Sequence, residues 1–342
     1  MSEGVTRLAV DAMGGDHAPE VVVAGAVAAA GELGAEIILV GPEKRIRQEL
    51  AKHGSSGARL AIVHAEDVVG MAEHAAAAVR QKPRSSIAVG VNLVREGRAD
   101  GFVSAGNSGA VMATALFRLG RIEGIERPAI GTVYPTTSGK CFILDIGANA
   151  DCRPEYLLQF AAMGSAYMEK IHGVAKPKVG LLSNGEEETK GNALAQASYP
   201  LLKASGLNFV GNVEGKDIPH GTADVVVTDG FVGNVVIKLS EGVGSALFDI
   251  LRAELTSSLV SKLAALALKP AFRRVRKRLD YTEYGGAPLL GVNGVVVIAH
   301  GRSNAVAIKN ALRVAKQSVD QKLVEAIRAG ALTTVVEREK LT

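Results

Sequence analysis

The chain has 342 residues, a formal net charge of +4 at pH 7 and two cysteines. A charge this mild does not favour a nucleic-acid partner, and two cysteines are too few for a disulfide framework or a four-ligand zinc site. No apolar stretch reaches the roughly 20 residues that span a bilayer, and the first residues lack the apolar segment of a signal peptide. We therefore expect a cytoplasmic protein, at most peripherally attached to a membrane, with no resident metal or cofactor.

The core must be built from aliphatic side chains, because 47% of the residues are hydrophobic while only 4% are aromatic. Short runs of Val, Ile and Leu without polar alternation are typical of strands covered on both faces. The predicted strands are residues 6–10, 36–40, 59–64, 99–103, 129–133, 141–146, 178–182, 207–210, 223–228 and 295–299. Helical segments fit between them, which predicts a doubly wound α/β fold: a largely parallel sheet with helices on both faces.

Helix boundaries can be placed at a few positions. Pro19 suits a first helical turn, and Gly34 suits the position just past the end of that helix. Ser85 can cap a later helix that Gly97 closes. With no linker or repeat in view, we expect a single domain over residues 1–332 and a frayed polar tail over 333–342.

Leucines repeat at intervals of four from Leu247 to Leu263, and basic residues follow Pro270. We expect Pro270 to end a long helix within a protruding helical hairpin at about 241–280. The leucines could pack in a core or dimer interface, or the tip of the hairpin could lie on anionic lipid. An acidic protein could instead dock on the basic run. The residues expected to contact the membrane or this acidic partner are Leu255, Leu259, Leu263, Arg273, Arg274, Arg276 and Lys277.

Loops rich in Gly, Asn, Asp and Ser follow most of the predicted strands. Ordinary turn chemistry explains any one of them. Ligands of open α/β sheets bind beyond the carboxyl ends of the strands, so we expect these loops to gather on one edge. Helices beginning near Asn107 and Phe231 would aim their N-termini at that edge, which predicts an anion site with phosphate as the occupant.

Several familiar sites are missing from the sequence. The chain has no P-loop, no dinucleotide-binding glycine fingerprint after the first strand, no G-x-S-x-G elbow and no H-E-x-x-H motif. Cys141 opens a predicted strand, so we expect it to be a buried small hydrophobe rather than an acyl-carrying nucleophile.

Together the loops resemble the phosphate acyltransferase (PlsX) family of bacterial phospholipid synthesis, from about Leu8 to Ala315. The motifs that carry the resemblance are residues 11–19, 104–110, 144–149, 180–192, 211–214, 224–238, 284–291 and 300–301. Ser108 and Ser183 stand where we expect Thr and Asn in relatives. The resemblance implies a homodimer with a fold like that of isocitrate and isopropylmalate dehydrogenases and of phosphate acetyltransferases.

The resemblance also implies an activity: transfer of a fatty acyl group from acyl carrier protein to inorganic phosphate, forming acyl phosphate for phospholipid synthesis. The implied partners are acyl carrier protein, phosphate, an anionic membrane surface and a membrane glycerol-phosphate acyltransferase. Phosphate is largely a dianion near neutral pH, and a thiol with a pKa of about 8.5 leaves readily. Such a site needs positioning and oxyanion stabilisation more than a covalent nucleophile.

We expect lysines to supply charge, backbone amides to hold phosphate, asparagines to serve the oxyanion or the pantetheine arm, and a histidine to donate to the departing sulfur. The acidic residues would orient these groups. The expected catalytic residues are His17, Lys190, Asn234, Lys238 and His300. The expected substrate-binding or phosphate-binding residues are Asp11, Gly14, Gly15, Asp16, Asn107, Ser108, Asp145, Asn149, Glu187, Asn192, Asn212, Glu214 and Asp229.

Two other functions stay open from the sequence. One is an NAD-dependent decarboxylating dehydrogenase on the same fold, although the usual glycine fingerprint is missing. The other is a non-enzymatic membrane adaptor that uses the leucine and arginine arm, which would leave the polar strand ends without a purpose.

Overall fold

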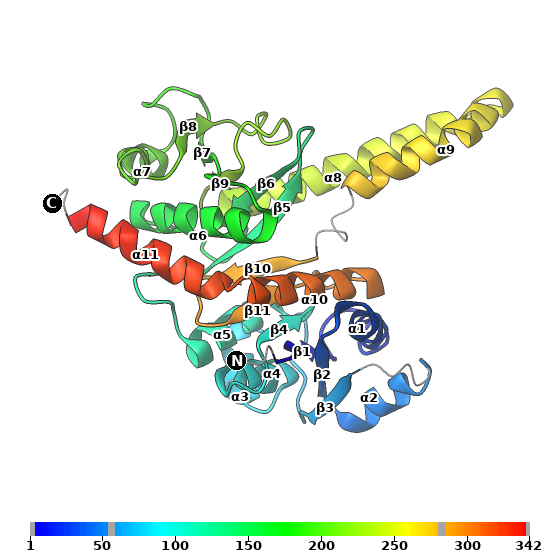
Figure 1. The fold of residues 1–342 in the computed structure, drawn as a ribbon. Coiled ribbons are helices and arrows are strands. Elements are labelled where there is room, and N and C mark those ends of the chain that lie inside the picture. The colour runs from blue at the N-terminus through cyan, green and yellow to red at the C-terminus, as the bar shows by residue number, and fades with distance from the viewer. Residues whose placement is uncertain (1–3, 54–58, 280–284, 340–342) are drawn as a thin grey trace.

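A computed structural model describes residues 4–53, 59–279 and 285–339, with side chains described up to Val275 and again over 285–331 (Figure 1). The strands are β1 (Arg7–Asp11), β2 (Glu36–Gly41), β3 (Leu60–His64), β4 (Gly101–Ser104), β5 (Ala129–Pro135), β6 (Lys140–Leu144), β7 (Val179–Leu182), β8 (Phe209–Val213), β9 (Val225–Val227), β10 (Ala287–Leu290) and β11 (Val295–Ile298). The helices are α1 (Glu20–Leu33), α2 (Glu43–Leu50), α3 (Ala75–Gln81), α4 (Ser86–Arg95), α5 (Ser108–Leu119), α6 (Pro154–His172), α7 (Ala193–Lys203), α8 (Gly230–Leu255), α9 (Leu259–Leu279), α10 (Ala305–Asp320) and α11 (Leu323–Glu339).

The predicted strands are all present, and the α/β class is confirmed. The prediction missed β10, where Pro288 removes a backbone donor and argues against a strand. It also placed β8 too early, since this strand begins at Phe209. The helix boundaries at Gly34 and Ser85 are confirmed: Gly34 has a φ of 64°, and the Ser85 hydroxyl accepts a hydrogen bond from the amide of Ala88 at 3.3 Å.

The described strands form one eleven-stranded sheet in the order β3-β2-β1-β4-β11-β10-β5-β6-β9-β7-β8. The first block consists of the parallel strands β3, β2, β1, β4 and β11. The second block consists of the parallel strands β6, β9, β7 and β8. Antiparallel β10 and β5 join the blocks, so the sheet is largely but not wholly parallel.

The two blocks run in opposite directions, so the prediction that all strand-end loops share one edge is wrong. Antiparallel pairings at β11–β10, β10–β5 and β5–β6 cause the reversal. The strand register nevertheless brings the ends of the two blocks to a similar level. Leu289 of β10 pairs with both Val296 and Ile130, and the next residue of β5, Gly131, pairs with Leu144. The carboxyl ends of β11 and β6 therefore lie nearly level across the sheet.

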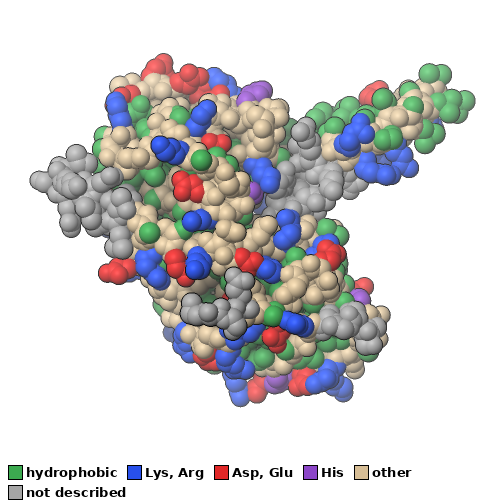
Figure 2. Space-filling model, viewed as in Figure 1, with side chains coloured by type: hydrophobic (Ala, Val, Ile, Leu, Met, Phe, Trp, Pro, Cys, Tyr) green, Lys and Arg blue, Asp and Glu red, His purple; other side chains and the backbone are tan. Residues whose placement is uncertain are grey.

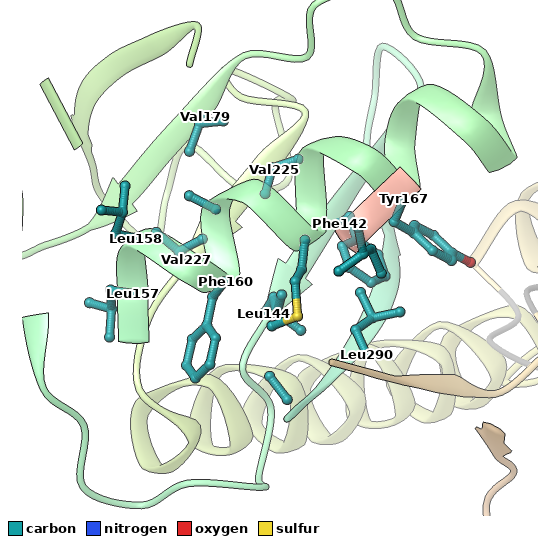
Figure 3. Close-up of a cluster of buried hydrophobic side chains, with 14 of the residues drawn as sticks. Phe142, Leu144, Leu157, Leu158, Phe160, Tyr167, Val179, Val225, Val227 and Leu290 are labelled. Carbon is teal, nitrogen blue, oxygen red and sulfur yellow. The ribbon is translucent and has the colours of Figure 1, made fainter. Parts of the chain in front are cut away.

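Helices cover both faces of each block, as predicted. The first block carries α1 and α10 on one face and α4 and α5 on the other. The second block packs against α6 on one face, where Phe142 stacks on Tyr167 with ring centroids 4.2 Å apart (Figure 3). On the other face, Val236 and Ile237 of α8 pack near Cys141. Cys141 is fully buried, which confirms that it is a core residue.

The C-terminal helix α11 crosses back to the second block and packs against α6 (Figure 1). Its Leu323, Ile327 and Ala331 belong to the same hydrophobic cluster as the core of that block. Because α11 extends to Glu339, most of the segment 333–342 is helical rather than a frayed tail.

A two-helix arm built from α8 and α9 projects from the body (Figure 1). The hairpin is confirmed, but its turn is at Thr256–Ser258 and not after Pro270, which lies inside α9. Hydroxyl groups make this turn: Thr256 Oγ1 donates to the carbonyl of Arg252 at 2.8 Å, and Ser258 Oγ accepts from the amide of Ser261 at 3.1 Å. Solvent can satisfy the backbone carbonyl that Pro270 leaves without a partner, because the arm is exposed.

The turn position separates the apolar and basic parts of the arm. Leu259 and Leu263, 76% and 62% exposed, lie near the tip. Arg273 lies roughly 20 Å back along α9 at a rise of about 1.5 Å per residue, and basic side chains mark that part of the arm in Figure 2. The side chains of Arg276 and Lys277, which were expected to join this surface, lie outside the described residues.

By length and composition alone, α8 could cross a membrane: it has 26 residues, and its most apolar window has a mean hydropathy of 1.3. The expectation that no stretch of the chain reaches this length was therefore wrong. Only 6% of that window is buried in the protein, so α8 is not an ordinary core helix.

Candidate functional site

Backbone packing holds the loops after β1 and β4 together. A Cβ at Gly14 would lie 2.6 Å from both the amide nitrogen of Gly106 and Oδ2 of Asp11, so only glycine fits there. Asp11 is buried, and Ser104 Oγ donates to its Oδ2 at 2.7 Å. Burial raises the pKa of Asp11, while hydrogen bonds from Ser86 and Ser104 oppose the rise. Asp11 thus orients the loops and does not itself face a ligand.

The loops after β1 and β11 meet beside Asp16. The amide of Asp16 donates to the carbonyl of Gly301 at 2.8 Å. Gly15 has a φ of 103°, which glycine adopts without strain, and a Cβ there would lie 3.0 Å from the same carbonyl. His17 follows directly and is exposed. Three of the expected residues therefore share one loop that is fixed by the neighbouring strand.

His300 lies where this loop meets the first turns of α8. Its Nδ1 accepts a hydrogen bond from the amide of Arg302 at 3.1 Å, so a neutral ring carries its proton on Nε2. Burial lowers the pKa of His300, and the charge of Lys238 lowers it further. His300 is therefore a neutral hydrogen-bond donor near neutral pH, beside Lys238 and Asp16. Lys238 is exposed and pairs with Glu241 at 3.2 Å.

The side chain of Asn107 caps α5 and holds a distant loop, which leaves its backbone amide as the group expected to hold phosphate. Its Oδ1 accepts from the amide of Ala110 at 3.0 Å, and its Nδ2 donates to the carbonyls of Gly70, Met71 and Glu73. Ser108, the first residue of α5, is exposed. Its amide lies at a helix N-terminus, where an anion is favoured.

In the second block, Asp145 and Asn149 build a rigid turn. Asp145 is fully buried and accepts from the amides of Ile130, Gly147, Ala148 and Asn149. Burial raises its pKa, although these bonds oppose the rise. Asn149 Nδ2 donates to the carbonyl of Pro128 at 2.9 Å and to Asp145. Asp145 thus orients Asn149, the task expected of the acidic residues. The two bonds of Asn149 Nδ2 hold the turn, so this group is not turned toward an oxyanion.

This turn supports the start of α8. A Cβ at Gly230 would lie 2.7 Å from the carbonyl of Asn149, and one at Gly233 would overlap the carbonyl of Asp145. Asp229 caps the helix by accepting from the amide of Val232 at 2.8 Å, so it too is structural. Asn234 is exposed, one turn before Lys238. The close glycine packing thus fixes the helix that carries Asn234 and Lys238.

The loop after β7 is tied to β8. Asn212 Nδ2 donates to the carbonyl of Glu187 at 2.7 Å. Its buried Oδ1 has no partner within the described residues, and an oxygen cannot stabilise an oxyanion. Asn192 caps α7 by accepting from Ala195 at 2.9 Å. Asn192 thus uses its side-chain oxygen for a cap and Asn212 uses its amide nitrogen to hold the loop, while Lys190 is exposed on this loop.

Glu214, which was expected to orient other groups of the site, forms an ion pair with Lys216, a lysine that was given no role. Oxygen atoms of Glu186, Glu214 and Asp217 lie within 4.8 Å of one another. Lys216 also approaches Glu186 at 3.8 Å, so a side-chain cation already balances part of this negative charge.

The structure thus brings together Gly14, Gly15, Asp16, Lys238 and His300, with His17 adjacent. We call these loops, the part of α8 that carries Lys238 and the N-terminus of α5 the crown. Ser104 and Gly301 were placed in the strand-end motifs of the sequence, but neither was given a role in the site. A groove of about 660 Å³, lined by Gly120–Glu126, Leu116 and Gln159, lies beyond the other end of α5. Its size does not mark it as the site, because none of the residues predicted for the site lines it.

A family model described as "Fatty acid synthesis protein" matches residues 6–326. A phosphate acyltransferase from Pelotomaculum thermopropionicum is 54% identical over 323 residues, which cover 94% of both chains. Another from Desulfitobacterium hafniense is 55% identical over 94% of this chain and 96% of the relative.

Solved structures of low identity share the fold. A phosphotransacetylase from Streptococcus pyogenes superposes with a TM-score of 0.64 at 19% identity, over 94% of each chain. A 4-hydroxythreonine-4-phosphate dehydrogenase from Klebsiella pneumoniae has a TM-score of 0.54 at 12% identity, over 92% of this chain and all of that one. These likenesses confirm the predicted kinship in fold with phosphotransacetylases.

The sequence relatives decide between the functions that were left open. They are acyltransferases, so the dehydrogenase and the non-enzymatic adaptor are excluded. The chain is an acyltransferase and belongs to the phosphate acyltransferase family.

Proposed function

We propose that this enzyme transfers a fatty acyl group from acyl carrier protein to inorganic phosphate, forming acyl phosphate for phospholipid synthesis. The observation that carries the proposal is the crown. There Lys238 lies close to the neutral donor His300, and Gly14 and Gly15 pack against the loop that leads into α5. Such a set favours a small anion next to a group that can donate a hydrogen bond.

In the proposed reaction, an oxygen of the phosphate dianion attacks the thioester carbonyl carbon. The new C–O bond pushes the carbonyl electrons onto oxygen, and collapse of this intermediate breaks the C–S bond. The sulfur leaves with the bonding pair as a thiolate, accepts a hydrogen bond from His300 Nε2 and takes its proton from water. Lys238 and the backbone amides hold the attacking phosphate, and one missing oxyanion donor would cost about 3 kcal/mol of barrier.

The cysteines support direct attack by phosphate over an acyl-enzyme. Burial raises the pKa of both Cys141 and Cys152 to about 12. Neither thiol is then a thiolate near neutral pH, and the thiolate is the nucleophilic form. The phosphate must therefore meet the thioester itself, which is the task for which the crown is suited.

The decisive experiment follows free thiol released from hexadecanoyl-acyl carrier protein, with and without phosphate, and with hexadecanoyl-coenzyme A as the competing donor. Lys238→Ala and His300→Gln should each lower kcat by at least tenfold. Lys216→Ala, a lysine outside the crown, should not. Thiol release that does not depend on phosphate would sink the proposal.

We further propose that the two parts of the arm have different partners. Arg273 and Arg274, on the stretch of α9 nearer the body, would attract the acidic acyl carrier protein. Leu259 and Leu263, near the tip, would enter the interface of an anionic membrane, with Lys262 at the head groups. The enzyme would then act in the cytoplasm as a peripheral protein and hand acyl phosphate to a membrane glycerol-phosphate acyltransferase.

We also propose that a second copy of the chain covers the apolar side of α8 to form the homodimer. Val243, Leu247 and Ile250 are each more than half exposed, which is unusual for three neighbouring residues of one helix. Sedimentation of Leu247→Glu should give monomers, while Leu259→Glu at the tip should stay dimeric. A dimer unaffected by Leu247→Glu would contradict this assignment.

A further inference from the structure

Residues 67–74, here called the strap, connect β3 to α3 and are fixed at several points. Lys82 Nζ donates to the carbonyl of Val68 at 2.8 Å and to Glu73 Oε1 at 2.6 Å. The same Glu73 oxygen accepts from the amide of Gly70 at 2.7 Å. Val69 is buried in the core beneath α4 and α5. The strap is therefore an ordered segment.

Asn107 ties the strap to the crown. Its Nδ2 donates to the carbonyls of Met71 and Glu73 at 3.1 and 2.9 Å, while its Oδ1 caps α5. One side chain thus links the backbone around Met71 to the N-terminus of α5, where the phosphate is proposed to bind. Any movement of the strap would disturb this cap.

Met71 lies in the middle of the strap, next to Gly301 of the crown. A Cβ built on Gly301 would meet the Met71 methyl group at 2.7 Å and the Asp16 carboxylate oxygens at 3.7 and 3.9 Å. The Met71 methyl and the Asp16 carboxylate therefore flank the same glycine, next to His300. Met71 is nevertheless 45% exposed, so an apolar side chain stands open to solvent beside a polar site.

We propose that Met71 packs against the acyl chain next to the thioester and makes the enzyme prefer fatty acyl over acetyl donors. This inference rests on the acyl transfer proposed above. A donor held with its carbonyl at the crown must lead its first methylene groups past this strap. Methionine suits that contact, because its unbranched thioether adapts to a flexible chain. An acetyl group has no such methylenes and gains nothing from the contact.

The test compares kcat/KM for hexadecanoyl-acyl carrier protein and acetyl-acyl carrier protein in Met71→Gln, which keeps the length of the side chain but makes it polar. We expect a loss of roughly tenfold for the long donor and less than twofold for acetyl, with the KM for phosphate unchanged. Met71→Leu should keep the wild-type preference. Phe117→Gln, at the far end of α5, is the matched control for an exposed apolar residue.

An equal loss with both donors, or a raised KM for phosphate, would show that Met71 only supports the loops, and this would overturn the inference. No change with either donor would overturn it too. In both cases the acyl transfer itself would stand, provided the wild-type enzyme makes acyl phosphate. A wild-type enzyme that makes none would overturn both.

Discussion

Ser104 Oγ donates a 2.7 Å hydrogen bond to Oδ2 of the buried carboxylate of Asp11, and this bond ties the strand-end loop of β4 to that of β1. We expect Ser104→Ala to lower the free energy of unfolding by about 1–3 kcal/mol, because it leaves a buried carboxylate short of a donor. Urea denaturation measures this change. The control is Ser318→Ala, another buried serine whose hydroxyl donates only within its own helix, to Val314 at 2.9 Å. Equal losses in the two variants would contradict a special role for the Ser104 bond.

The raised pKa of Asp11 predicts a pH dependence of stability. The folded protein holds this proton more tightly than the unfolded chain, so the contribution to stability is greatest at low pH. It is lost as pH rises from the ordinary value of 3.8 through the folded pKa. Asp11→Asn should remove this loss, so its free energy of unfolding should rise relative to wild type as pH increases. Denaturation across that range checks it, with exposed Asp151→Asn as the control; parallel curves for wild type and Asp11→Asn would refute the prediction.

Because Lys238 lies near His300, we expect the pKa of His300 to depend on the charge of Lys238. His300 should titrate below its ordinary pKa of 6.5, because burial and the nearby cation both disfavour the imidazolium. Lys238→Met removes the second cause, so the pKa of His300 should rise. NMR of labelled histidine follows this directly, without an activity assay. Lys216→Met should leave the pKa of His300 unchanged. An unchanged pKa of His300 in Lys238→Met would contradict the effect of the Lys238 charge on His300.

Two glycines of α8 should respond in opposite ways to alanine. A Cβ at Gly233 would overlap the carbonyl of Asp145, so Gly233→Ala should lower the free energy of unfolding by about 3 kcal/mol. Gly242 has nothing within 4 Å of its added Cβ, so Gly242→Ala should raise it by about 0.5–1 kcal/mol. Guanidinium denaturation distinguishes the signs. A stabilised Gly233→Ala would mean that α8 does not rest on the β6 loop as described.

The two ends of α9 should serve different functions, with lipid contact at the tip and binding of acyl carrier protein at the basic stretch. Leu259→Glu should weaken flotation on vesicles that contain phosphatidylglycerol, because a charge enters the interface at the tip. Arg273→Glu should leave flotation largely intact and raise the KM for acyl-acyl carrier protein. The two measurements are made on the same pair of variants. A reversed pattern would assign lipid to the basic stretch and acyl carrier protein to the tip.

The strands and several helix ends could be read from the sequence, because apolar runs and capping residues act locally. The reversal of the second block could not, since it depends on β10, where Pro288 conceals a strand. Pro270 led to the prediction of a helix end that does not exist, because the backbone carbonyl that it leaves unpaired is tolerable in an exposed arm. Hydroxyl groups near Thr256 set the turn instead.

The site residues were recognised by type but not always by role. Asn107, Asn149 and Asn192 carry side chains that could serve a ligand, yet each is used for a cap or a turn. Local hydrogen bonds compete with ligand binding for the same amide, and the sequence does not show which wins. Lys238 and His300 could be named from their positions after strands, but their proximity depends on the register of β10 and β5.

The position of α11 has a consequence for biosynthesis. Leu323, Ile327 and Ala331 complete the core around Phe160 and Leu157, yet the ribosome makes them long after those two residues. The second block therefore cannot close its core until the ribosome has synthesised α11, and its apolar surface stays open until then. Chains that stall or are cut before Leu323 would be targets for chaperones and proteases, which gives the cell a check that each enzyme has been synthesised through α11.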